Sequence, residues 1–248
     1  MKILFAGPSL AQDISLLVAG KDTFVCAGPV TRGGVLKAVI DGAVAIGIVD
    51  GRFEDTLSVW HKEILYALSL GVAVAGAASM GALRASECSA FGMIGIGEVY
   101  RRYATGQLTD DADVGQVHAP AELNYFALTE PLVNIEPTLA KMQAAELIDS
   151  AEEEDLWIRA RVLHYKERTY RALFNGSSRI DSPRAEVLLA WTTKNAVNQK
   201  RLDALELVAW LKLQPTQRGK RPDWEFSDTS HWQALMRSLT ECRAYRAA

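Results

Sequence analysis

The sequence predicts an α/β fold: a mostly parallel sheet flanked by helices, Rossmann-like in its layering, followed by a helical C-terminal region. Three observations lead to this prediction. Short apolar runs alternate with helical patterns in the first third of the chain, each run ends at a turn, and no strand pattern follows residue 150. Continuous apolar strands that alternate with helices are typical of parallel sheets covered on both faces.

Strands are predicted at residues 2–6, 24–27, 44–49 and 72–75, and these runs end at Gly7-Pro8-Ser9, Gly28-Pro29, Asp50-Gly51 and Gly76-Ala77-Ala78-Ser79. Helical spacing over residues 34–40 and 57–70 places helices after the second and third strands. The sequence does not give the strand order. Functional sites in such sheets lie beyond the carboxyl ends of the strands, so the four turns are the first places to look for chemistry.

The pattern becomes helical after Phe91. Residues 92–97 are predicted to form a glycine-rich turn before a helix at about residues 98–105. Further helices are expected at residues 131–148, 151–174, 183–195, 199–213 and about 231–244, with a loop over residues 214–228. We therefore divide the chain into an α/β core, residues 1–149, and a helical C-terminal region, residues 150–248.

Composition excludes several classes of protein. The chain has 248 residues, of which 49% are hydrophobic, and a net charge of −3, as in an ordinary globular protein without an electrostatic preference for nucleic acid. No apolar run approaches the roughly 18 residues of a membrane span, and the apolar start is too short for a signal peptide. The three cysteines are widely spaced, which favours a reducing, cytoplasmic location over disulfides or structural zinc.

The strongest local signal is the small-residue turn that contains Ser79. The segment Gly76-Ala77-Ala78-Ser79-Met80-Gly81 carries a predicted strand into a predicted helix. This pattern resembles a nucleophile elbow, with alanine in place of the first glycine and Gly81 in the place of the second. The alternative is structural, because serine is a preferred helix N-cap and small residues permit close packing. The residues alone leave both interpretations open.

A nucleophilic serine needs a base, and the helix after the third strand offers candidates. His61, Lys62 and Glu63 lie in its first turns. Successive helix residues point about 100° apart, so His61 and Lys62 cannot both approach one hydroxyl. Lys62 would need a pKa lowered by burial, whereas His61 would need no such shift. The structural alternative makes these residues solvated helix charges.

Other polar residues have two interpretations each. Arg84 and Glu87 are spaced as an ion pair, or Arg84 holds a carboxylate. Asp50 is an acid of the site or a turn residue. The aspartates at 110–113 with His118 lack the pattern of an EF-hand, and no glycine-rich segment has the spacing of a nucleotide-binding loop. We therefore expect no metal and no cofactor.

The motifs together resemble the TfuA-like family over roughly residues 1–150. The resemblance rests on Gly7-Pro8-Ser9 and on residues 48–53, 58–65, 76–87, 91–93, 95–100, 110–111, 118 and 130–135. The blocks SVWHKEIL and GAASMGALR are the most specific of these. The rest of the chain carries no motif that we can match.

The resemblance implies a partner of a YcaO enzyme, which itself uses ATP to activate a peptide backbone amide for thioamide formation. Proteins of this family are understood to hydrolyse the C-terminal thiocarboxylate of a ThiS-type carrier protein, releasing sulfide, and to help the YcaO enzyme engage its precursor peptide. The family's Ser-Lys pair maps onto Ser79 as nucleophile and Lys62 as base. The supporting residues are then expected to be His61, Arg84, Asp50, Gly81 and Glu87. The competing function is a non-catalytic adaptor that docks carrier or peptide onto the YcaO enzyme.

Overall fold

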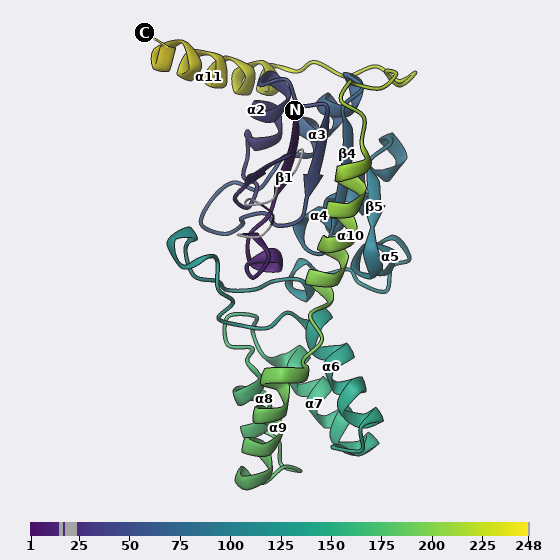
Figure 1. Ribbon diagram of the computed structural model, residues 1–248, viewed down its shortest axis with the longest axis vertical. Coiled ribbons are helices and arrows are strands. Elements are labelled where there is room, and N and C mark those ends of the chain that lie inside the picture. Colours follow the sequence, from purple (N-terminus) through teal and green to yellow (C-terminus); the bar gives the residue numbers. More distant parts are fainter. Residues whose placement is uncertain (15–16, 18–23, 248) are drawn as a thin grey trace.

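The sheet has five parallel strands in the order β2-β1-β3-β4-β5 (Figure 1). The computed structural model describes residues 1–14, 17 and 24–247. The strands are β1 (Lys2–Phe5), β2 (Phe24–Ala27), β3 (Ala45–Ile48), β4 (Ala73–Ala77) and β5 (Ile94–Ile96). This is the doubly wound order in which the winding direction reverses between β1 and β3, and ligands of such sheets bind at that switch point.

The helices follow the strands in the expected alternation and then continue alone. They are α2 (Gly34–Ile40), α3 (His61–Ser69), α4 (Met80–Cys88), α5 (Gly97–Ala104), α6 (Leu132–Ala144), α7 (Ser150–Val162), α8 (Tyr170–Asn175), α9 (Ser182–Asn195), α10 (Gln199–Leu213) and α11 (Ser230–Ala247). Short 3-10 turns lie at Pro8–Leu10, Ser89–Phe91, Asp111–Asp113 and Ala121–Leu123.

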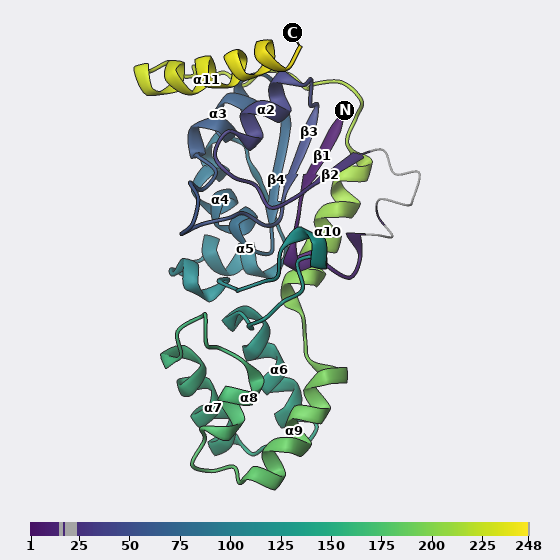
Figure 2. The ribbon, with the colours of Figure 1, turned by 90° about the vertical axis from the view of Figure 1, so that its left-hand side faces the viewer.

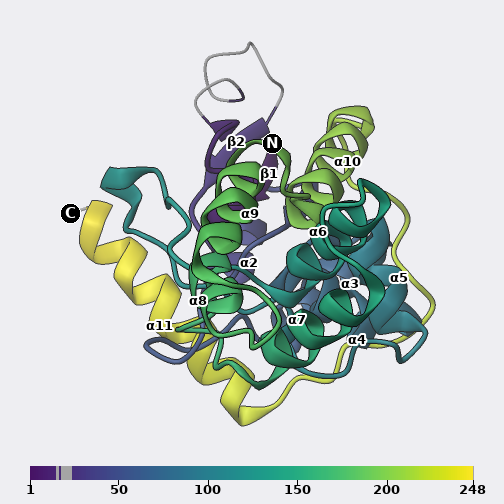
Figure 3. The same ribbon diagram turned by 90° about the horizontal axis from the view of Figure 1, so that it is seen from below.

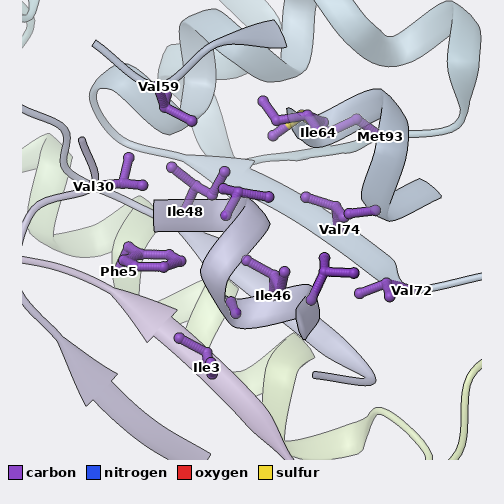
Figure 4. Close-up of a cluster of buried hydrophobic side chains, with 14 of the residues drawn as sticks. Ile3, Phe5, Val30, Ile46, Ile48, Val59, Ile64, Val72, Val74 and Met93 are labelled. Carbon is purple, nitrogen blue, oxygen red and sulfur yellow. The ribbon is translucent and has the colours of Figure 1, made fainter. Parts of the chain in front are cut away.

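Alternate residues of each strand face two different hydrophobic cores. Ile3 and Phe5 of β1, with Ile46 and Ile48 of β3, lie on the face that α2, α3 and α4 cover (Figure 4). Leu4 points to the opposite face. Side chains alternate in direction along a strand, and here both directions are apolar because both faces are buried.

Helix α10 covers the second face of the sheet (Figure 2). Its buried side chains include Ala204, Leu207 and Leu211. Gly47 of β3 makes this packing possible, because a Cβ at that position would meet the Leu207 side chain at 2.5 Å. A helix far along the chain is therefore an integral part of the α/β layers.

Helices α6 to α9 pack around a separate core below the carboxyl ends of the strands (Figures 1 and 3). Leu139, Leu156 and Phe174 are fully buried in it. The loop between α7 and α8 is held by Arg168, whose guanidinium donates to the carbonyls of Ala160, Ala112 and Leu163. The carboxyl edge of the sheet thus faces a helical group.

The structure confirms the predicted fold class and corrects some of its elements. The segment expected to be only a glycine-rich turn contains β5, and the helix expected over residues 151–174 is divided into α7 and α8. Residues 34–40 and 199–213 form helices with the predicted bounds. No helix in the described part of the chain has both the length and the apolar character needed to cross a bilayer.

Candidate active site

A cavity with a volume of about 730 Å³ lies at the carboxyl ends of β1, β2, β3 and β4. It is lined by Pro8 and Gly28 after the first two strands, by Asp50 and Ser79 after the next two, and by Lys200 of α10. We call it the Ser79 cavity. Its position includes the switch point between β1 and β3, where a doubly wound sheet is expected to bind its ligand.

Ser79 follows a strained turn. Ala78, which is fully buried, has a φ of 67°, a left-handed conformation that is uncommon for a residue with a side chain. The Ser79 N–H donates to the carbonyl of Ala77 at 2.7 Å, which closes a three-residue turn around Ala78. Strained backbone of this kind is found most often at functional sites.

The hydroxyl of Ser79 does not cap the helix that follows. Ser79 occupies the N-cap position of α4, yet its side chain accepts no backbone N–H there. Among the described residues its hydroxyl has no hydrogen-bond partner, and the residue lines the cavity. This geometry disfavours the structural interpretation, in which a capping hydrogen bond accounts for the serine.

The two glycines around Ser79 have a packing role. A Cβ on Gly81 would overlap the carbonyl oxygen of Ile48, and a Cβ on Gly76 would overlap that of Gly81. The Gly81 N–H donates to the carbonyl of Val49 at 3.1 Å. Gly81 is therefore a supporting residue in the sense that its missing side chain lets the first turn of α4 lie directly against β3.

One backbone donor at the start of α4 is uncommitted. The N–H groups of Ala82 and Leu83 donate to the carbonyl of Ser79, and that of Gly81 donates to Val49. In the part of the chain that the structure describes, no hydrogen bond uses the Met80 N–H. The residue after the nucleophile supplies one oxyanion donor in a nucleophile elbow.

Asp50 joins the ends of β1 and β3. Its carboxylate accepts hydrogen bonds from the backbone N–H groups of Gly7 at 2.8 Å and Ser9 at 3.0 Å, and from the Ser9 hydroxyl at 2.7 Å. The residue is only 2% exposed. Asp50 therefore holds the floor of the cavity together rather than forming an ordinary exposed turn.

Lys200 is a buried cationic residue in the same cavity. Its Nζ donates to the carbonyl of Val114 at 3.1 Å and to Oε1 of Gln116 at 3.0 Å, and it lies 4.0 Å from Asp50. Burial lowers the pKa of Lys200 below its ordinary value, although Asp50 and Glu130 oppose the shift. The two donated hydrogen bonds hold the Lys200 amine in place at the wall of the cavity.

A second lysine, Lys166, lines the cavity, but its pKa is shifted in the opposite direction. Lys166 is paired with Glu54, whose hydrogen bond raises the pKa of the lysine. His118, which was weighed as a metal ligand, also lines the cavity, and its Nδ1 lies 2.8 Å from the Ala119 carbonyl oxygen. The described residues contain no cluster of His, Cys, Asp or Glu side chains suited to hold a metal.

The structure places Lys62 away from the Ser79 cavity. Its Nζ donates to Oγ1 of Thr229 at 2.9 Å and lies 5.4 Å from the centre of the Phe226 ring. Lys62 is not among the residues that line the cavity, and no contact in the described structure joins it to Ser79. The predicted Ser79–Lys62 pair is therefore not formed here, because Lys62 extends toward the segment before α11.

His61, Arg84 and Glu87 form a separate network. Oε2 of Glu87 lies 2.7 Å from both His61 Nε2 and an Arg84 nitrogen. Burial alone would raise the pKa of Glu87, but the hydrogen bonds from His61 and Arg84 outweigh it and hold the pKa below its usual value. The spacing of Arg84 and Glu87 on α4 thus produces the expected ion pair, and neither residue lines the cavity.

Lys200 is the site residue that sequence reasoning missed. It belongs to the predicted helical region, far along the chain from the strand-end turns. A signal was nevertheless present, because Lys200 falls at helical spacing in line with Ala204, Leu207 and Leu211, on the apolar face of α10. A lysine on such a face is buried when the helix packs, and buried charge marks a candidate functional residue.

The fold and the cavity define an α/β protein of the doubly wound type, in which a serine on a strained strand-to-helix turn and a buried lysine line the same cavity. The family model described as "TfuA-like protein" matches residues 50–169. These residues are similar to the TfuA-like family, which confirms the resemblance over this segment of the chain. The match begins just after β3 and ends just before α8, and it includes Ser79 but not Lys200. No curated protein matches the chain.

Proposed function

We propose that this protein hydrolyses the C-terminal thiocarboxylate of a small ThiS-type carrier protein and so delivers sulfide to a YcaO enzyme. The similarity of residues 50–169 to the TfuA-like family supports the biological setting. The observation that carries the chemistry is the Ser79 turn, where a strained residue precedes a serine whose hydroxyl faces a cavity instead of capping its helix.

The proposed base is Lys200 rather than Lys62. A base must be neutral to take the serine proton, and an ordinary lysine is protonated near neutral pH. Burial shifts the pKa of Lys200 in the required direction, whereas Lys166 is shifted the other way. Lys62 lies on a different surface, beside Thr229.

The proposed reaction has two halves. Ser79 Oγ attacks the thiocarboxylate carbon while Lys200 takes the hydroxyl proton, and the tetrahedral oxyanion is bound by the Met80 N–H. The C–S bond then breaks, Lys200 returns the proton to sulfur, and hydrosulfide leaves an acyl ester on Ser79. In the second half Lys200 removes a proton from water, the hydroxide attacks the ester, and Lys200 returns the proton to Ser79 Oγ as the ester C–O bond breaks. The carboxylic acid formed then loses its proton to solvent and leaves as the carboxylate.

The test is intact-mass spectrometry of a thiocarboxylated ThiS-type carrier incubated with this protein. The wild type is expected to convert the carrier to its carboxylate, with a loss of mass equal to the difference between sulfur and oxygen. Ser79→Ala is expected to abolish conversion while the protein keeps its unfolding midpoint. The control is Ser86→Ala on α4, whose hydroxyl donates only to the Leu83 carbonyl. Conversion of the thiocarboxylate by Ser79→Ala at the wild-type rate would rule out Ser79 as the nucleophile.

A non-catalytic adaptor remains the second candidate function. An exposed groove with basic side chains, described below, favours it because such a groove suits docking more than bond cleavage. The adaptor predicts that Ser79→Ala supports full thioamidation by the YcaO enzyme. The hydrolase predicts that the same variant supports none until free sulfide is added.

A further inference from the structure

A second hollow lies beside the Ser79 cavity and has its own chemistry. It has a volume of about 420 Å³ and is lined by Arg32, Leu57, Ser58, Val59, Trp60, His61, Arg84 and His231. We call it the basic groove. A volume of this size accommodates a few side chains of a bound ligand. The groove includes Ser58 to His61 of the specific block SVWHKEIL, and the proposed hydrolysis uses none of these residues.

The cationic side chains of the groove are held in place. The guanidinium of Arg32 lies over the Trp60 ring, 5.1 Å from its centre, and the backbone N–H of Arg32 donates to the Leu57 carbonyl at 2.9 Å. Arg84 is only 12% exposed in its side chain and donates to the Val59 carbonyl at 3.2 Å. These contacts fix the two arginines before any ligand arrives, which reduces the entropy lost on binding.

The charge of the groove is unbalanced. Its lining holds two arginines and two histidines and no carboxylate. Glu87 touches Arg84 and His61 from outside the lining, and among the described residues no carboxylate pairs with Arg32. In a chain with a net charge of −3, this local excess of positive charge favours an anionic partner.

The groove also presents apolar surface. Leu57 is 63% exposed, although it is a large aliphatic side chain, and it lies beside Val59 and the aromatic Trp60. A small anion without an apolar part would gain no binding energy from this apolar surface. A ligand that carries both a carboxylate and an adjacent apolar side chain would use both parts of it, as peptide partners do at mixed interfaces.

Lys62 has a role in this surface. By donating to Thr229 Oγ1, it holds the start of α11 against α3, and Thr229 also accepts the N–H of Trp232 at 3.4 Å. Trp232 packs on Tyr66 of α3 with a ring separation of 4.9 Å. These contacts place His231 at the groove. Lys62 is therefore a positioning residue for the groove.

We propose that the basic groove is a docking site for an acidic peptide segment of a partner protein, with the carboxylates on Arg32 and Arg84 and a neighbouring apolar side chain on Leu57 and Trp60. The groove and the Ser79 cavity use separate side chains. Peptide binding is therefore independent of hydrolysis, and Ser79→Ala is expected to bind as the wild type does.

The test is fluorescence anisotropy with a fluorescein-labelled dodecapeptide of alternating glutamate and leucine. Two matched peptides replace glutamate by lysine or leucine by serine. We expect the glutamate–leucine peptide to bind saturably, both matched peptides to bind at least about tenfold more weakly, and affinity to fall as salt is added. Arg32→Glu is expected to weaken binding by at least about tenfold because it reverses the charge that the carboxylate meets.

The control is Arg171→Glu, which makes the same charge change on α8, where Arg171 pairs with Glu186 in an exposed ion pair. It is expected to keep the wild-type affinity within about twofold. Equal binding of the lysine peptide, unchanged binding by Arg32→Glu, or no saturable binding would each overturn the proposal. Loss of selectivity for leucine over serine would reduce the groove to a simple anion site and would overturn it as well.

Discussion

The Ser79 cavity and the basic groove are built from neighbouring segments but treat charge in different ways. Thr31 lines the cavity and Arg32 lines the groove, and Ser79 and Arg84 are separated by about one turn of α4. In the cavity, Lys200 and Asp50 are almost fully buried. At the groove, His61 is partly exposed, and so is Glu87 just outside the lining. Burial perturbs pKa values and prepares groups for proton transfer, whereas exposed charges mainly select a partner.

The largest expected effect that tests this comparison comes from substituting Lys200 of the cavity and Lys62 beside the groove. Lys200→Met is expected to lower the rate of thiocarboxylate hydrolysis by at least about 100-fold, the usual contribution of a general base. Lys62→Met is expected to keep the rate within about threefold and to weaken peptide binding in the groove instead. Single-turnover rates followed by intact mass provide the measurement. Equal losses in the two variants would contradict the separation of cavity and groove.

The Lys200 variant also needs a stability control. Lys200→Met removes the amine beside the buried Asp50 and both hydrogen bonds that Nζ donates, so it is expected to lower the urea midpoint. Rates are therefore compared under conditions in which urea unfolding shows the variant to be folded, so that the lost rate reports chemistry. A Lys200→Arg variant keeps the charge but cannot act as a base, and it is expected to be as slow as Lys200→Met.

The next test concerns the position of Ser79. Gly81→Ala places a methyl group on the Ile48 carbonyl, so α4 must shift away from β3. Overpacking of this kind costs about 1–3 kcal/mol in the free energy of unfolding. We also expect hydrolysis to fall by about tenfold or more, because small displacements of a nucleophile are costly. The matched control is Gly219→Ala, where a Cβ would meet only an ordinary contact with Gly71. A fully active Gly81→Ala protein would contradict the proposed geometry.

The next prediction concerns how the rate of thiocarboxylate hydrolysis depends on pH. Only neutral Lys200 can accept the serine proton, so the rate is expected to rise with pH and to level off above the pKa of Lys200. Burial lowers that pKa, which places the inflection below the ordinary value for lysine. Initial rates between pH 6 and pH 10 check this. Lys62→Met and Lys166→Met are expected to keep the inflection, and a flat profile in the wild type would exclude Lys200 as the base.

The same contrast explains what the sequence predicted and what it missed. Ser79, Gly81 and Asp50 were found because strand-end turns are local patterns, and the structure places all three at the carboxyl edge of the sheet. Lys200 was missed because α10 reaches the cavity only through tertiary packing. The fifth strand was missed because Ile94–Ile96 is three residues long and contains a glycine.

The base assignment shows a further limit of sequence reasoning. Lys62 was chosen because the Ser-Lys pair of the resembled family maps onto it, but a sequence block does not fix the direction of a side chain on a helix. In the structure, Lys62 Nζ lies over the Phe226 ring, which packs on Trp232. A residue such as Lys62 can thus belong to a distinctive sequence block and still contact the surface around the basic groove rather than the Ser79 cavity.

The smallest expected effect concerns Glu87 and has opposite signs for stability and binding. Its pKa is lower in the folded protein than the ordinary 4.5, so it contributes stability above that pH and loses the contribution as pH falls through the folded pKa. Because Glu87 is about one-third exposed, Glu87→Gln is expected to cost less than about 1 kcal/mol at pH 7 and a smaller amount at pH 3. Urea unfolding at the two pH values measures this difference. The same variant removes the carboxylate beside Arg84 and His61, so the acidic peptide is expected to bind more tightly. Weaker peptide binding by Glu87→Gln would mean that the network orders the groove more than it neutralises it.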